Sequence, residues 1–174
     1  MAHSTQLWRC SLLASAVLAL AACGGSDDSP TPAPPPPPSP PETKLLPGKV
    51  ARIGMLQNVV VCLDLNANNA CDAGEPASAK TGADGAYSVD VTQVPAADLA
   101  GARLIALVDA TAIDGASAGP ATDNAYVMTR PAGTGGAINP LTTLVQKGIS
   151  GGMSEADARK NVAIQLALDA ARID

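Results

Sequence analysis

Alternating and continuous runs of apolar residues predict a mainly β domain that begins near residue 48. We expect strands over the following segments: 50–53, 59–63, 86–91, 104–108 and 124–129. The third segment alternates with a period of two after an Asp84-Gly85 turn, as a half-buried strand does. The fourth is continuously apolar and is expected to be buried on both faces. Many short strands separated by turn signals are typical of a β-sandwich.

Two helices are expected after these strands. Asn139 and Pro140 supply a cap and a first helical residue, and this helix is expected to end at Gly148. Ser154 caps a second helix. Its apolar stripe is formed by Ala158, Val162, Leu166 and Ala170, widened by Ile164 and Leu168. So wide a stripe needs a partner. Either the helices dock on the strands, or the chain is a piece of, or a partner for, something larger.

The N-terminal pattern is that of an export signal. Arg9 precedes an apolar run over 12–22, which is too short to span a bilayer and fits the central region of a signal peptide. The run ends in two alanines followed by Cys23, which resembles the bacterial lipobox. The resemblance implies that residues 1–22 are removed and that Cys23 carries acyl chains.

Lipidation of Cys23 would anchor the protein to a membrane, because two or more acyl chains give stable binding. By resemblance to other lipoproteins, Gly24 after the cysteine implies the outer membrane. The alternative is ordinary secretion, with cleavage after Ala21.

The segment after Cys23 is expected to be a tether, which we place at 23–47. Nine prolines occur between Ser29 and Pro41. Proline lacks the N–H group and fixes φ, so this stretch favours extended polyproline II. Twelve such residues would span on the order of 37 Å. We interpret the segment as a stalk; the competing interpretation is a ligand for a proline-binding module.

A twelve-residue loop from Asp64 to Glu75 has the spacing of a calcium-binding loop. Its side-chain ligands would be Asp64, Asn66, Asn68, Asp72 and Glu75, with the backbone carbonyl of Ala70. Asn69 stands where such loops usually have glycine. With three carboxylates, we expect weak calcium affinity, of order 10⁻⁵–10⁻³ M. The alternative is a metal-free turn held by Asx hydrogen bonds.

Cys62 and Cys71 flank most of this loop. If Cys10 is removed and Cys23 is acylated, they are the only pair left in an oxidising compartment, and we expect a disulfide. The bond would pre-organise the calcium ligands. A redox role is the alternative, although the spacing is not Cys-x-x-Cys.

Three segments together resemble a known module: 54–66, 71–76 and 81–87. They are similar to carboxypeptidase regulatory-like and Sdr B-type domains of bacterial surface proteins. The resemblance covers residues 48–92. It implies a transthyretin-like sandwich that serves a structural or adhesive role, is often calcium-bound, and has no catalysis of its own.

Composition excludes several classes of function. The only histidine and tryptophan, His3 and Trp8, lie in the predicted signal peptide, and the chain has no phenylalanine. Imidazole-based catalytic triads and aromatic stacking platforms are therefore excluded from the mature chain. The net charge of −5 argues against a nucleic-acid partner.

Two further patterns are expected to be structural. The segment 115–119 reads Gly-x-Ser-x-Gly, but it lies in a Gly/Ala/Ser-rich loop with no histidine base. Asp109, Asp114 and Asp123 are expected to be solvated turn carboxylates rather than a second ion site.

These features divide the chain into a signal peptide (1–22), a lipidated tether (23–47), a small transthyretin- or immunoglobulin-like β-sandwich (48–132) and a helical segment (133–174). We expect a non-enzymatic lipoprotein of the cell envelope, held in the outer membrane through Cys23, with a calcium-stabilised module for structural or adhesive contact with a protein partner. The alternative is an accessory module or fragment of a larger secreted hydrolase or transport-associated lipoprotein.

Overall fold

The computed structural model describes residues 42–133 and 135–174. The predicted signal peptide, Cys23 and the proline run lie outside the described residues. Among the helices that are described, none has the length and apolar character needed to cross a membrane.

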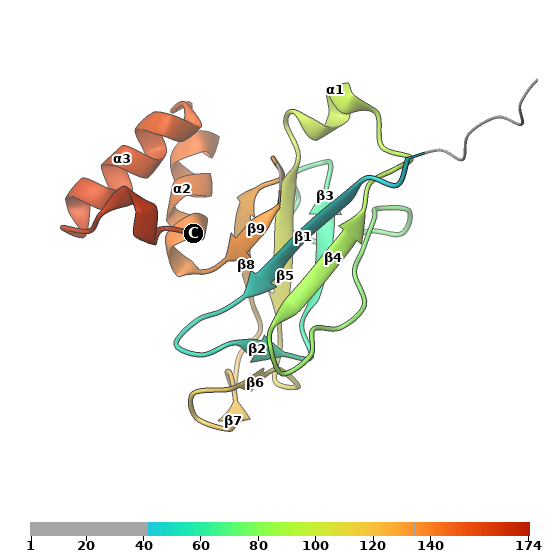
Figure 1. The fold of residues 1–174 in the computed structure, drawn as a ribbon, viewed down its shortest axis with the longest axis vertical. Coiled ribbons are helices and arrows are strands. Elements are labelled where there is room, and N and C mark those ends of the chain that lie inside the picture. The colour runs from blue at the N-terminus through green and yellow to red at the C-terminus, as the bar shows by residue number, and fades with distance from the viewer. Residues whose placement is uncertain (1–41, 134) are drawn as a thin grey trace, which may run out of the picture. The chain divides into compact units, whose positions relative to one another are not determined.

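The described chain is mainly strands, followed by a helix pair, as predicted at this level (Figure 1). One sheet has the order β4 (Ala86–Asp90), β1 (Leu45–Val50), β9 (Gly136–Ile138). A second, antiparallel sheet has the order β3 (Val60–Asp64), β5 (Arg103–Val108), β8 (Tyr126–Pro131). A small third sheet contains β2 (Leu56–Gln57), β6 (Ile113–Asp114) and β7 (Gly119–Pro120). The helical elements are α1 (Ala96–Leu99), α2 (Pro140–Ser150), α3 (Glu155–Gln165) and the 3₁₀ helix η1 (Ala170–Arg172).

One apolar cluster joins the two larger sheets. It contains Val50 and Ile138 from the first sheet, and Val61, Leu104 and other residues from the second. Strand β4 follows its predicted alternation, with Tyr87 and Val89 buried and the three residues around them exposed. Strand β5 is almost completely buried, as its continuous apolar run predicts, because it is the central strand of its sheet.

The first predicted strand and two boundaries differ from the structure. Residues 51–53 of the strand expected over 50–53 follow β1 rather than forming a strand, and Ile53 is 82% exposed. Strand β1 begins at Leu45, inside the segment predicted as tether, because Leu46 is buried in the core opposite Val89. Strand β9 lies inside 133–174, which was predicted to be helical, and β8 is therefore not the last strand. This strand pairs with the second half of β1 through backbone hydrogen bonds. Its short sequence has no apolar alternation from which a strand could be predicted.

Glycine allows this close backbone pairing. A Cβ at Gly48 would collide with the carbonyl oxygen of Gly136 and with the Tyr87 ring. Pro47 lacks an N–H group, but the pairing of β1 with β9 begins only at Gly48, so the proline does not interrupt it.

Helix α2 begins at the predicted cap but is longer than expected. The Asn139 side chain accepts a hydrogen bond from the Thr142 backbone N–H at 2.9 Å. The helix continues through Gly148 to Ser150. A Cβ at Gly148 would lie 3.0 Å from the Ala158 Cβ, so this glycine permits close approach of α2 to α3 rather than ending the helix.

The apolar stripe predicted for the second helix is only half right. Ala158 and Val162 are buried against Val145 of α2. Helix α3 ends at Gln165, and Ala167 adopts a positive φ of 51° that turns the chain back. The second half of the stripe is exposed as a result, with Ile164, Leu166 and Leu168 at 69%, 44% and 37%.

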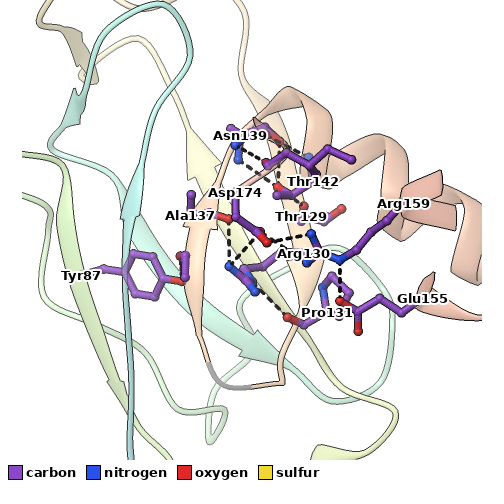
Figure 2. A network of polar contacts seen from close by, with 12 residues as sticks. Tyr87, Thr129, Arg130, Pro131, Ala137, Asn139, Thr142, Glu155, Arg159 and Asp174 are labelled. Atoms are coloured by element: carbon purple, nitrogen blue, oxygen red, sulfur yellow. Dashed lines mark hydrogen bonds and ion pairs between the residues drawn. The ribbon is translucent and has the colours of Figure 1, made fainter. Parts of the chain in front are cut away.

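The helices dock on the strands, which is one of the two alternatives left open above. Helix α2 packs against β8, and the Thr142 hydroxyl donates to the Thr129 carbonyl at 3.0 Å. Figure 2 shows a polar network beside this contact, in which buried Arg130 donates to the Ala137 carbonyl at 3.1 Å and lies 3.7 Å from Asp174. Arg159 of α3 binds the same Asp174 carboxylate at 2.7 Å.

Candidate metal-binding loop

The loop from Asp64 to Glu75 is held at both ends. The predicted disulfide between Cys62 and Cys71 is present, with the two Cα atoms 5.8 Å apart. Beyond the loop the chain returns alongside β3, where the Leu63 N–H donates to the Pro76 carbonyl at 2.8 Å. The returning chain and the disulfide together restrict the loop at its base.

Asp64 is the buried anchor of the loop. It ends β3, is 1% exposed, and accepts backbone hydrogen bonds from Asn68 at 3.2 Å and Asn69 at 3.0 Å. The Nε atom of Arg103 lies 2.9 Å from its Oδ2 atom. Burial acts to raise the pKa of Asp64, but the hydrogen bond and charge of Arg103 and the Asn69 N–H outweigh it and hold the pKa below its ordinary value.

Two asparagines converge on a second carboxylate. The Nδ2 atoms of Asn66 and Asn68 each lie 2.7 Å from Oδ2 of Asp72. Their own carbonyl oxygens accept backbone N–H groups two residues further on, from Asn68 at 3.0 Å and from Ala70 at 2.8 Å. These are Asx turns, the pattern of the metal-free alternative.

Glu75 closes the loop. Its Oε1 accepts the Leu65 N–H at 2.8 Å, and its Oε2 accepts the Asp72 N–H at 3.0 Å. The two carboxylate oxygens therefore join the first and last thirds of the loop through backbone hydrogen bonds.

The backbone of the loop is sharply curved. Asn69 has a φ of 62° and Ala67 a φ of 63°, both in the left-handed region. Asparagine tolerates this region better than most residues, which accounts for Asn69 at a position where calcium loops usually have glycine.

The donor atoms are all oxygens, as a hard cation requires, and the loop brings Asn66, Asn68 and Asp72 together. Each of its three carboxylates also accepts hydrogen bonds from the chain itself. Within the described residues, no group of three or more His, Cys, Asp or Glu side chains is placed to hold a metal ion. Calcium binding by this loop stays a prediction.

Arg103 is the residue that the sequence did not suggest. The β3–β5 register places it directly opposite Asp64. The only available signal was its position just before the long apolar run of β5, and that position does not reveal which residue lies across from it.

The other candidate residues have structural roles. Asp114 was predicted to be solvated, but it is 1% exposed, pairs with Arg52 at 3.3 Å and accepts the Gly54 N–H at 3.0 Å. It organises the turn between β1 and β2 from within. Asp109 and Asp123 are exposed. The Gly-x-Ser-x-Gly segment forms the turn between β6 and β7, which is not a strand–nucleophile–helix arrangement.

No family model, curated protein or solved structure matches this chain.

Proposed function

We propose that this chain is a non-enzymatic lipoprotein that displays a calcium-stabilised β-sandwich at the outer membrane. The observation that carries the proposal is the Asp64–Glu75 loop: the Cys62–Cys71 disulfide restrains it, and its first residue is a buried carboxylate. Calcium would rigidify this loop, which would then provide a contact surface for a protein partner in the cell envelope.

In the proposed calcium-bound state, Asn66 and Asn68 would have to reorient around Asp72. Their amide groups now direct N–H donors at the Asp72 carboxylate, where a positive charge is favoured. Rotating each amide by half a turn would present carbonyl oxygens at the same place. The rotation would cost the bonds to the Asn68 and Ala70 N–H groups, and the cation would compete with Arg103 for Asp64. These costs are consistent with the weak affinity expected from the sequence.

The sandwich assignment rests on the shared core. Apolar side chains of β1, β4 and β9 join one cluster with those of β3, β5 and β8, as the inner faces of two packed sheets do. The resemblance of segments 54–66, 71–76 and 81–87 to carboxypeptidase regulatory-like and Sdr B-type domains supports the same proposal from the sequence.

Anchoring through acyl chains at Cys23, with the proline-rich segment as a stalk, is the part of the proposal that rests on the sequence. Mass spectrometry of the protein from membranes tests it. A diacylated or triacylated Cys23 at the N-terminus supports the anchor, and a free N-terminus after Ala21 supports ordinary secretion.

One observation favours the alternative of an accessory module. Ile164, Leu166 and Leu168 are exposed near one another in the chain, and apolar side chains of this size gain from a covering surface. A coding frame that continues past residue 174 into catalytic motifs would favour this second candidate.

Calorimetric melting with millimolar calcium and then with chelator tests the loop. For a dissociation constant of ~10⁻⁵ M, the tight end of the expected range, calcium at ~1 mM stabilises by ~2.7 kcal/mol. This corresponds to a rise in Tm on the order of 10 °C for this size of domain. At the weak end, ~10⁻³ M, ~100 mM calcium is needed for the same rise. Glu75→Gln should abolish the rise, whereas Glu42→Gln, the same change at an exposed residue outside the loop, should keep it. Magnesium should not reproduce it. If calcium does not raise the Tm of the wild-type protein, the loop is a metal-free turn held by Asx hydrogen bonds.

A further inference from the structure

Strand β8 forms one edge of the second sheet, and helix α2 covers only part of that edge. The strand pairs with β5 on its other side. On the edge side, the Thr129 N–H donates to the Thr143 hydroxyl at 3.0 Å, and the Thr129 carbonyl accepts from the Thr142 hydroxyl at 3.0 Å. Two side chains of α2 therefore take the place of a neighbouring strand at Thr129.

Val127 carries the next pair of backbone groups on this edge. In an antiparallel ladder, the N–H and carbonyl groups of alternate residues point to the same side of the strand, so those of Val127 point the same way as those of Thr129. Within residues 42–133 and 135–174, neither group of Val127 has a hydrogen-bond partner on that side. An open strand edge of this kind is a template for an added strand.

A row of apolar side chains runs across the sheet from this edge. The register places Val60 opposite Leu107 and Leu107 opposite Val127, and all three residues are half-buried. A cavity of about 300 Å³ lies beside the row and is lined by Leu107, Tyr126 and Val127, among others. An apolar side chain on an added strand, directly opposite Val127, would extend the row and cover part of its surface.

Opposite charges flank Val127 along the strand. Asp109 is exposed and lines this cavity together with Ala125. Lys147 of α2 is also exposed, and it lines a second cavity together with Val127 and Thr129. Neither charged group makes an ion pair within the described part of the chain. At ~3.3 Å per residue, the four-residue step from Ala125 to Thr129 separates the two ends of this edge by about 13 Å.

We infer that the open edge of β8 at Val127 binds an extended peptide segment of a partner protein, in which an apolar residue lies between an acidic and a basic residue. The segment adds an antiparallel strand, so its acidic residue comes first, beside Lys147, and its basic residue lies beside Asp109. The N–H and carbonyl groups of its apolar residue pair with those of Val127. The inference rests on the proposed role in contact with a protein partner, but it uses a surface other than the metal-binding loop and needs no calcium.

The probe is the capped peptide Glu-Thr-Val-Thr-Lys, titrated at millimolar concentration into the isotope-labelled protein and followed by NMR. The Val127 amide signal should shift downfield and its hydrogen exchange should slow, because the N–H gains an acceptor. The same peptide with an N-methylated valine should bind about 5-fold more weakly or worse, since it lacks one backbone donor. The titration is made in chelator, so its failure leaves the proposed calcium response untouched.

Two lysine variants test the direction of the strand. Lys147→Gln should weaken binding about 2–5-fold, as an exposed ion pair contributes, and should have no effect on a peptide that carries Gln in place of Glu. Lys160→Gln, the same change at an exposed lysine of α3 that lines neither cavity, should leave binding unchanged. The inference fails if the peptide leaves the Val127 signal in place or if N-methylation does not weaken binding. It also fails if raising the protein concentration alone shifts Val127, which would place a second copy of this chain on the edge.

Discussion

Removing the Cys62–Cys71 disulfide should destabilise the domain by an amount that follows from its place in the chain. The bond closes a loop of about ten residues, for which loop-closure entropy gives ~2.7 kcal/mol at 25 °C. For a domain of this size the change corresponds to a fall in Tm of roughly 10 °C.

The perturbation can be made in two ways that separate the cross-link from packing. Reduction of the wild-type protein breaks the bond and keeps both sulfur atoms. The double variant Cys62→Ala, Cys71→Ala also deletes a sulfur from a fully buried position at Cys62. The double variant should therefore be less stable than the reduced protein by the cost of a small cavity, about 1 kcal/mol.

The assay is urea unfolding of the oxidised, reduced and double-variant proteins, each with calcium and with chelator. We expect the calcium-dependent stabilisation to shrink in both disulfide-free proteins, since the bond restricts Asp64 and Asp72 before an ion binds. Equal free energies of unfolding for the oxidised and reduced proteins would refute the entropic reasoning. An unchanged calcium response would refute the pre-organisation.

The two tyrosines and one helix glycine give the remaining predictions. Tyr87→Phe leaves the Gly136 carbonyl without its 2.7 Å hydrogen bond and should lower the free energy of unfolding in urea by about 1 kcal/mol. Tyr126→Phe deletes a buried hydroxyl that has no partner in the described chain, so its effect on stability should be neutral or stabilising. A larger loss of stability in Tyr126→Phe than in Tyr87→Phe would contradict the hydrogen-bond assignment. Burial raises the pKa of Tyr87 to about 12, so the stability it contributes is complete below its unfolded pKa near 10 and is lost as the pH rises from there to 12. Stability measured over this range should fall less steeply in Tyr87→Phe than in Tyr126→Phe, and parallel curves would count against the shift. Gly148→Ala should lower Tm despite the better helix propensity of alanine, because overpacking against Ala158 costs about 1–3 kcal/mol; a higher Tm would mean that the helices can separate.

Patterns within short stretches of sequence correctly predicted those elements that depend mainly on interactions between residues close in the chain. The alternation of β4, the continuous apolar run of β5, and the Asn139 and Ser154 caps were all found as predicted. The disulfide between Cys62 and Cys71 was also predicted correctly, because the two cysteines lie close in the sequence and the prediction needs no knowledge of distant contacts.

The features that the sequence did not predict depend on contacts between distant segments. Strand β9 forms by pairing with the edge of β1. The helix continues through Gly148, where the missing side chain leaves room for Ala158 of α3. The Asp64–Arg103 pair depends on strand register, and the burial of Asp114 depends on Arg52 and the turn after β1.

The position of β1 between β4 and β9 has a consequence for biosynthesis. The first strand of the domain can pair with β4 once residues 86–90 have been made, but its parallel pairing with β9 also requires Ile138. Until then one edge of β1 stays open, and the Val50 side chain lacks its Ile138 neighbour in the strand pairing. Non-local pairing of this kind slows folding and exposes strand edges to other chains. With the export signal that the sequence predicts, the late completion of this sheet would help to keep the chain unfolded until it has been synthesised beyond β9.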